Sequence, residues 1–136
     1  MTVENAKEVN QLSAQLGYPL SLGETIHQMN KILESEDHVA LVAAIDKKIV
    51  GWIHAFIAIR MESKPFIEIG GLVVDENFRK HKIGSKLVGA IADWCRKEKI
   101  DTLRVRCNTK RKETHLFYQK LNFNETKEQK IFQLIL

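Results

Sequence analysis

A short basic segment contains the residue types that bind phosphate groups. It consists of Arg79, Lys80, His81, Lys82, Ile83, Gly84 and Ser85. An apolar run typical of a strand precedes it, and apolar residues at helical spacing follow it. The first N–H groups of a helix are unpaired and lie at the positive end of its dipole, and Gly84 has no side chain to keep a phosphate away from them. The spacing predicts a pyrophosphate-binding turn, although an ordinary strand-to-helix loop with a solvated basic surface fits the same residues.

The elements expected around this turn describe an α/β fold with a mixed sheet. Apolar spacing predicts helices at 3–16, at 22–35 with a capping box of Ser21 and Glu24, from 83 to the charged stop at 96–99, and at 112–121. β-rich runs predict strands at 39–45, 49–59, 66–74, 102–107 and 130–136, the first two joined as a hairpin. Gly70 and Gly71 in the third strand predict a bulge or the close approach of another backbone.

Length and composition exclude several classes of protein. The 136 residues are 44% hydrophobic and 28% charged, which predicts a single domain over 1–136. No apolar run approaches the roughly 20 residues that span a bilayer. Residues 1–10 carry acidic side chains where a signal peptide would be basic, so we expect a cytoplasmic protein. Cys95 and Cys107 form no CxxC pair, so we expect neither a disulfide scaffold nor a metal site.

The charge is divided unevenly along the chain. Residues 1–68 contain six basic and nine acidic side chains, a net charge of −3, whereas residues 69–136 contain fifteen and eight, a net charge of +7. A basic half suits an anionic ligand, which is either nucleic acid or a phosphorylated cofactor, and an acidic half suits a cationic one. Charge by itself does not choose between them.

Two segments, in the same order along the chain, resemble motifs of the GNAT superfamily of N-acetyltransferases. Arg79 to Gly84 resembles the motif [R/Q]-x-x-G-x-[G/A], and residues 115–123 resemble x-x-F-Y-x-x-x-G-F. Lys82 and Asn122 stand where these motifs have glycine, and asparagine adopts left-handed geometry readily. The usual first strand of the family is missing. The resemblance implies a GNAT-like mixed sheet flanked by helices that begins one strand short.

The resemblance also implies acetyl-coenzyme A as the co-substrate, bound where two parallel strands splay apart. The backbone of Leu72, Val73 and Val74 would pair with the pantetheine arm, and the N–H of Leu72 would polarise the thioester carbonyl. The basic turn would hold the pyrophosphate. Asn108, at the end of the strand across the cleft, would contact cofactor or substrate, although a plain strand-end cap fits it equally well.

Direct attack of an amine on a thioester moves two protons, and two residues are candidates for these steps. Tyr118 matches the general acid of the superfamily, and the alternative is an aromatic residue at the edge of the core. Glu68 is our candidate for the base, because burial beside apolar strands would raise its pKa, and similar aminoglycoside 6′-N-acetyltransferases have a glutamate there. A structural strand glutamate is the alternative. His54, on the strand face of Trp52 and Phe56, either lines the acceptor pocket or is merely packed.

These observations predict transfer of acetyl to a primary amine. The segments 68–74 and 108–118 look most like the small-molecule branch that modifies aminoglycosides or aminoalkylphosphonates, and the acidic first half suits a small cationic amine. The alternatives are a protein N-acetyltransferase, a non-catalytic acyl-coenzyme A-binding module, and a nucleic-acid-binding module that uses the basic residues at 104–112. We expect no nucleic-acid partner. A sticky final strand at 130–136 favours a homodimer.

Overall fold

The computed structural model describes residues 1–79 and 81–136. The helices and strands follow the expected order as far as residue 120. They are η1 (Val3–Asn5), α1 (Ala6–Gln15), α2 (Leu22–Glu34), β1 (His38–Ile45), β2 (Lys48–Arg60), β3 (Ser63–Val74), η2 (Glu76–His81), α3 (Ile83–Lys97), β4 (Leu103–Val105) and α4 (Lys112–Lys120). No helix among the described residues combines the length and the apolar content needed to cross a membrane. The chain forms two compact units, Met1–Val105 and Arg106–Leu136.

The first unit contains a four-stranded mixed sheet with strand order β1-β2-β3-β4. β1, β2 and β3 are antiparallel, and β4 is parallel to β3. Asp46 and Lys47 form the two-residue turn of the β1–β2 hairpin, with φ values of 48° and 67°. Positive φ at both positions matches the twist of the flanking strands, as in a type I′ turn. The expected hairpin and mixed sheet are confirmed.

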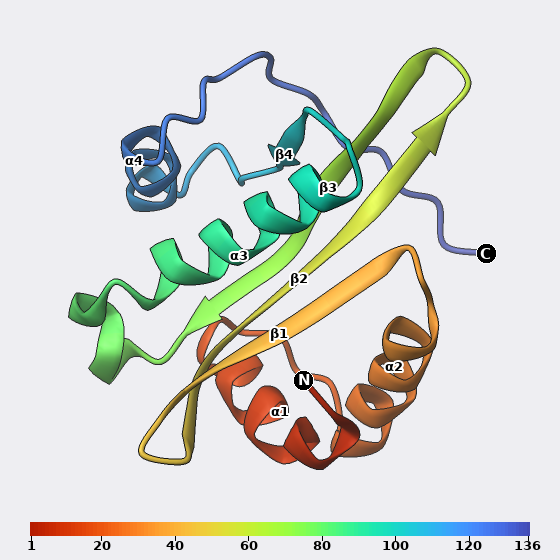
Figure 1. Ribbon diagram of the computed structural model, residues 1–136. Helices are drawn as coiled ribbons and strands as arrows, with labels where there is room; N and C mark the ends of the chain where they lie inside the picture. Colours follow the sequence, from red (N-terminus) through yellow and green to blue (C-terminus); the bar gives the residue numbers. More distant parts are fainter. The chain divides into compact units, whose positions relative to one another are not determined.

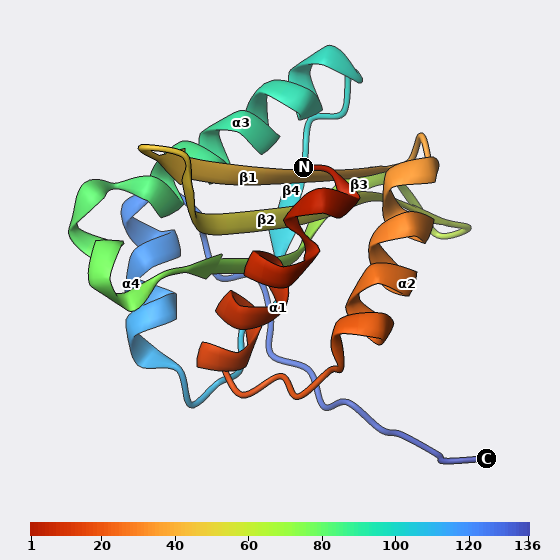
Figure 2. The same ribbon diagram turned by 90° about the horizontal axis from the view of Figure 1, so that it is seen from below.

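Helices cover both faces of this sheet (Figures 1 and 2): α1 and α2 lie on one face and α3 lies on the other. Ala6, Val9 and Met29 form the core under α1 and α2, and Trp52 of β2 packs against them. Alternate residues of β2 face α3, since a Cβ atom on Gly51 would lie 3.3 Å from Cγ2 of Ile83. Trp52, His54 and Phe56 therefore share the face that α1 and α2 cover.

Local signals explain why the helices begin where they do. Ser21 Oγ accepts a hydrogen bond from the Glu24 N–H at 3.1 Å, and Glu24 Oε1 accepts one from the Ser21 N–H at 3.0 Å. This is the predicted capping box, and it satisfies two otherwise unpaired donors. Hydrogen bonding to the backbone and then to the side chain of Ser21 lowers the pKa of the Glu24 carboxyl.

The second unit contains α4 and the C-terminal segment. Leu121 is the C-cap of α4, and Asn122 takes the left-handed conformation at φ 69°, as expected for the residue in the glycine position of the second motif. The predicted strand at 102–107 is shorter than expected, since β4 spans Leu103–Val105.

The prediction of a strand at 130–136 is wrong. These residues form no regular secondary structure, and Ile131, Phe132, Leu134, Ile135 and Leu136 are each at least 80% exposed. A strand is stable only when its N–H and C=O groups pair with a neighbouring strand. The unit Arg106–Leu136 contains no other strand, so the β-rich sequence has no ladder partner within it.

Candidate active site

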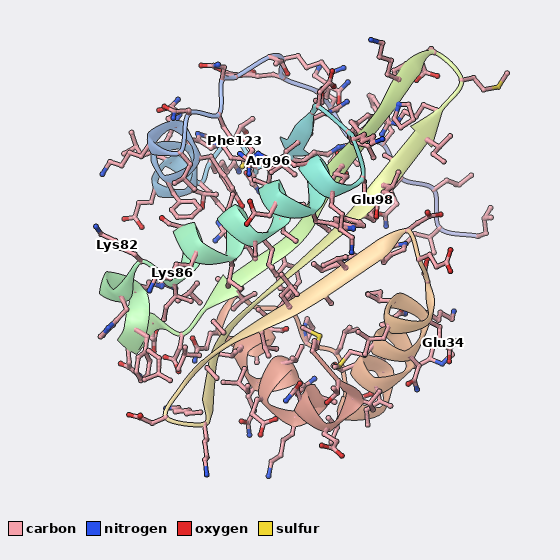
Figure 3. The ribbon with its side chains drawn as sticks, in the orientation of Figure 1. Glu34, Lys82, Lys86, Arg96, Glu98 and Phe123 are labelled. Carbon is pink, nitrogen blue, oxygen red and sulfur yellow. The ribbon has the colours of Figure 1, made fainter. Side chains whose placement is uncertain are left out.

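The basic turn connects β3 to α3 through η2, and Lys82 is the single residue between η2 and α3. Lys82 has φ 57° and ψ 26°, the left-handed conformation that glycine adopts most easily. A lysine at the glycine position of the motif therefore still produces the backbone geometry of glycine. Figure 3 shows Lys82 and Lys86 at the start of α3. Lys80, which the sequence also placed in this turn, has a side chain that lies outside the described residues.

The N-terminus of α3 differs from those of the other helices in its charge. α1, α2, η2 and α4 each have a glutamate in the first turn, whereas the described first turn of α3 has no acidic residue. The side chain of Lys82 does not cap the helix either. The positive end of the α3 dipole is thus left without a carboxylate from its own first turn, and an anion there would be stabilised.

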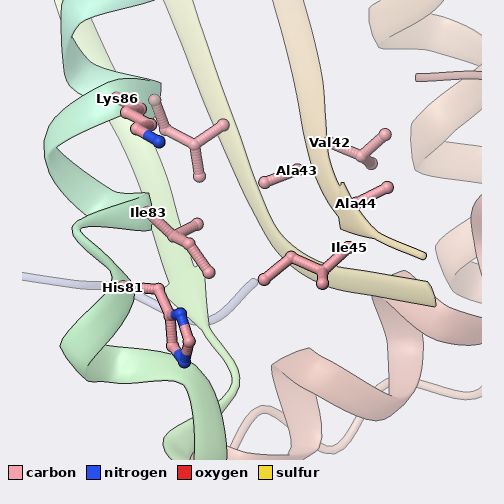
Figure 4. Close-up of a pocket in the computed structure, with 8 residues that line it drawn as sticks. Val42, Ala43, Ala44, Ile45, His81, Ile83 and Lys86 are labelled. Atoms are coloured by element: carbon pink, nitrogen blue, oxygen red, sulfur yellow. The ribbon is translucent and has the colours of Figure 1, made fainter. Parts of the chain in front are cut away.

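A cavity of about 360 Å³ lies beside the same turn (Figure 4). It separates the end of β1 from the start of α3, and His81 and Ile83 face Ile45 across it. The lining residues are Val42, Ala43, Ala44, Ile45, His81, Ile83, Lys86 and Leu87. The cavity combines the apolar surface of β1 with a cationic side chain at the helix start.

β3 contains the predicted bulge. His54 pairs with Gly71 and Ala55 pairs with Ile69, so Gly70 is the extra residue in the ladder. A Cβ atom on Gly70 would lie 2.8 Å from Nδ1 of His54, and one on Gly71 would lie 2.8 Å from Cη2 of Trp52. Aromatic side chains, rather than another backbone, make the close approach that requires glycine at both positions.

The outer edge of β3 is open beyond the bulge. β4 pairs with Ile67, Glu68 and Ile69 only, whereas β3 continues to Val74. Among the described residues, the ladder between these two parallel strands therefore ends immediately before Gly70. The segment Leu72–Val74, which the sequence assigned to the pantetheine arm, lies in this part of β3 and leads into the basic turn.

Glu68 lies on the face of the sheet that α1 and α2 cover. It pairs with Phe56 of β2 and with Arg104 of β4, and Phe56 pairs with His38 of β1. Directly opposed residues point to the same face, so these four side chains form one row across the sheet. Glu68 is only 9% exposed. Its burial next to the bulge agrees with the position that the sequence analysis gave it.

The side chain of Arg104, one of the basic residues at 104–112, makes a contact within the protein. Its guanidinium lies over the ring of Phe66 at 4.3 Å from the centroid. This cation–π contact uses one of the side chains that the nucleic-acid hypothesis assigned to phosphates.

Tyr118 belongs to the second unit, where it is buried at 7% exposure. Its ring makes edge-to-face contacts with Phe117 and Phe123, at centroid distances of 5.0 and 5.2 Å. Burial raises the pKa of Tyr118 well above its usual value; nearby Cys107 adds to the rise and Arg111 opposes it. The phenol therefore keeps its proton at neutral pH and is available as a donor.

Asn108 also belongs to the second unit. Its Oδ1 accepts a hydrogen bond from the Lys110 N–H at 2.9 Å, and His115 Nε2 lies 2.8 Å from its carbonyl oxygen. These contacts stabilise the turn before α4. The structure thus brings Glu68, the bulge and the basic turn together in one unit, and Tyr118 and Asn108 in the other.

No signal in the sequence pointed to His38. It forms a hydrogen bond with His54, which it reaches only through the pairing of β1 with β2. The two histidines are sixteen residues apart and belong to no sequence motif. Their contact could be predicted only from the register of the β1–β2 hairpin.

Comparisons with known proteins agree with this architecture. The chain aligns over 100% of its length with 96% of the aminoglycoside antibiotic 6′-N-acetyltransferase AAC(6′)-IG from Acinetobacter haemolyticus, at 16% identity and a TM-score of 0.88. It aligns over 98% of its length with 91% of the aminoglycoside N-acetyltransferase AAC(6′)-Iy in complex with CoA, at 18% identity and a TM-score of 0.89. An aminoglycoside acetyltransferase from an uncultured soil metagenomic sample has 22% identity and a TM-score of 0.80, over 100% of this chain and 93% of that one.

These similarities confirm the α/β GNAT-like fold, a mixed sheet flanked by helices. A family model gives the second, independent comparison, since the acetyltransferase (GNAT) family matches residues 8–123. The match includes the bulge, the basic turn and Tyr118. The chain therefore belongs to the GNAT family of acetyltransferases, and its co-substrate is acetyl-coenzyme A.

Proposed function

We propose that this chain transfers acetyl from acetyl-coenzyme A to the primary amine of a small cationic molecule by direct attack. The observation that carries the proposal is the open edge of β3. β3 loses its β4 partner at the glycine bulge and leads through η2 to α3, which begins without an acidic residue in its first turn. An extended amide-containing arm can pair with such an edge, and a pyrophosphate can bind at such a helix start.

The proposed cofactor site follows the chain from β3 to α3. The backbone of Leu72, Val73 and Val74 pairs with the pantetheine arm, and the Leu72 N–H donates to the thioester carbonyl. Arg79, His81, Lys82, Ile83, Gly84 and Ser85 surround the pyrophosphate, and the side chain of Lys86 adds charge beside them. Asn108 remains a candidate contact from the second unit, in addition to its capping bonds.

The proposed chemistry uses one acid and one base. Glu68 takes a proton from the acceptor ammonium, directly or through a water, and the free amine forms the new N–C bond at the thioester carbonyl. The C–S bond breaks, and Tyr118 donates its proton to the departing thiolate. The second proton lost by the amine nitrogen, as the amide forms, restores the phenol of Tyr118. The buried phenol of Tyr118 keeps its proton at neutral pH, so this proton is present for donation when the thiolate departs.

The acceptor class rests on charge and on the structural neighbours. The first half of the chain is net negative and supplies α1 and α2, which cover the face of Glu68. Several structural neighbours are described as acetyltransferases of aminoglycosides, which are small polycationic amines. A cationic acceptor is attracted to such a surface, whereas an anionic one is repelled.

A screen of amines tests this function. The panel contains kanamycin, spermine, an aminoalkylphosphonate and a peptide with a free N-terminus, and acetyl-coenzyme A-dependent thiol release is measured. We expect release with kanamycin or spermine. Glu68→Gln should lower kcat by roughly 10²–10⁴-fold. The matched control is Glu62→Gln, at an exposed glutamate in the turn between β2 and β3. Exclusive acetylation of the phosphonate or the peptide would contradict the acceptor class, and an unchanged kcat for Glu68→Gln would make this glutamate structural.

We also propose that the protein forms a homodimer through residues 130–136. Five large apolar side chains, each at least 80% exposed, are concentrated in this segment. Its β-rich sequence can pair with a strand edge of a second copy, which would bury those side chains. Light scattering after size exclusion should give twice the 15.7 kDa chain mass, and Phe132→Lys with Leu134→Lys should give a monomer. A monomeric unmodified protein at micromolar concentration would contradict the dimer.

A further inference from the structure

Two histidines form a hydrogen-bonded pair on the face of the sheet that carries Glu68. Nδ1 of His38 and Nε2 of His54 are 2.8 Å apart, and the two rings are stacked with a centroid distance of 5.1 Å. Phe56 lies beside both rings, at 5.5 Å from His38 and 5.8 Å from His54. An aromatic neighbour on the same strand face thus fixes the orientation of the pair.

The other nitrogen of His54 points at the glycine bulge. A Cβ atom on Gly70 would lie 2.8 Å from His54 Nδ1, so the backbone of the bulge passes directly over this atom. His54 of β2 pairs with Gly71 of β3, and Phe56, the next residue of β2 on the same face, pairs with Glu68. Glu68 is therefore the diagonal neighbour of His54 on this face. Side chains in such diagonal positions lie within reach of each other, directly or through one water.

The surroundings keep His54 uncharged. Burial, and secondarily the charge of His38, lower its pKa to about 4, so at pH 7 one ring nitrogen is a donor and the other an acceptor. The row on this face also contains His38, Glu68 and, opposite Glu68 on β4, the cationic Arg104. α1 contributes Glu8, which has one buried carboxylate oxygen. α2 buries the uncharged Thr25 and Met29.

The reaction proposed above produces a proton that must leave this covered face. An ammonium acceptor loses two protons when it becomes an amide. One of them is balanced by the proton that the thiolate gains, and the second is released in every turnover. If Glu68 receives it, Glu68 must be deprotonated again before the next turnover. With only 9% of Glu68 exposed, direct exchange with bulk water is restricted.

We propose that His54 and His38 form a proton relay that carries this proton from Glu68 to solvent. The proposal rests on the function proposed above. The Glu68 carboxyl gives its proton to Nδ1 of His54, the Nε2–H of His54 passes to Nδ1 of His38, and Nε2–H of the half-buried His38 passes to water. No bond other than N–H and O–H changes, and the charge removed from Glu68 appears as one proton in solution. Both rings end in the other tautomer, and exchange of their N–H protons with water returns His54 and His38 to their starting tautomers.

Kinetics of three variants with kanamycin and spermine test the relay. His54→Ala should lower kcat by about 10²-fold, the lower end of the range for assisted proton transfer, with acetyl-coenzyme A affinity changed by less than about twofold. Added imidazole should restore part of this loss, because it can occupy the space of the missing ring and carry a proton. His54→Gln keeps a polar contact for His38 but cannot relay a proton, so it should show the same loss. His27→Ala removes an exposed histidine of α2 and should retain full activity.

The relay also predicts non-additive effects. If protons pass from Glu68 to His54 in series, Glu68→Gln combined with His54→Ala should be no slower than the slower single variant. Multiplied losses, or a loss in His54→Ala that imidazole does not restore, would overturn the relay and leave His54 as a packing residue. An unchanged kcat in His54→Ala would overturn it as well.

An NMR measurement separates failure of the relay from failure of the proposed function. The imidazole nitrogens of the unmodified protein are recorded with and without acetyl-coenzyme A, and the His54 signals are assigned with His54→Gln. Binding at the bulge should shift Nδ1 of His54, even if neither amine is the acceptor. Unshifted signals, in a sample that calorimetry shows to be saturated, would overturn the relay. Shifted signals without acetylation of either amine would overturn only the acceptor class.

Discussion

Gly71→Ala should destabilise the protein because the added methyl group has no room. Its carbon would lie 2.8 Å from Cη2 and 2.9 Å from Cζ3 of Trp52, whereas favourable carbon contacts are about 3.5–4.0 Å. Trp52 cannot simply turn aside, since its ring packs against the core of Ala6, Val9 and Met29. Overpacking of this kind costs about 1–3 kcal/mol. For a chain of this size, each kcal/mol lowers Tm by about 3–4 °C, so a loss of about 3–12 °C is expected.

Thermal unfolding followed by circular dichroism measures the change, and Gly89→Ala is the matched control. Gly89 lies within α3, and a Cβ atom there would have no atom within 4 Å. Alanine is a better helix former than glycine by about 0.8–1 kcal/mol, so Gly89→Ala should raise Tm. The same chemical change thus has opposite signs at the two positions.

A double-mutant cycle identifies Trp52 as the cause. Trp52→Phe removes the ring atoms Cη2 and Cζ3, so Gly71→Ala should cost less in that background than in the unmodified protein. An equal cost in both backgrounds would refute the proposed contact. So would a Gly71→Ala variant with the Tm of the unmodified protein.

Three further predictions concern the basic turn and Tyr118, the proposed general acid. Gly84→Val should weaken coenzyme A binding at least about tenfold, or 1.4 kcal/mol, by calorimetry, and unchanged affinity in a folded variant would disprove the pyrophosphate assignment. Tyr118→Phe should lower kcat by roughly 10²–10⁴-fold with cofactor affinity retained, and an unchanged kcat when chemistry limits turnover would leave Tyr118 a packing residue. Because burial raises the pKa of Tyr118, the pH profile of activity should show no basic limb from this group below about pH 10, its ordinary pKa. Lys82→Gly should leave the free energy of unfolding unchanged or raise it by up to about 1 kcal/mol. Lys82→Val should lower it by at least about 1 kcal/mol, because a β-branched residue fits φ 57° poorly. Equal stabilities of the two variants by urea denaturation would argue against the left-handed turn.

Sequence-local interactions could be predicted without a structure. The Ser21 and Glu24 pair begins α2, and Asn122 takes the left-handed conformation after α4, because both features depend on residues only a few positions apart. The motif residues from Arg79 to Gly84 indicated the family for the same reason, since a strand, a turn and a helix start adjoin one another in the chain.

The tertiary structure decided what depends on strand partners. The β-rich segment 130–136 has the composition of a strand, but its backbone finds no ladder within its own unit. The approach of Trp52 and His54 to the two glycines, and the bond between His38 and His54, exist only because β2 pairs with β3 and β1 in one particular register. A shift of one residue would turn every one of these side chains to the other face. Composition and spacing along the chain determine which segments can form helices and strands, whereas the pairing of distant segments determines which side chains meet at the bulge.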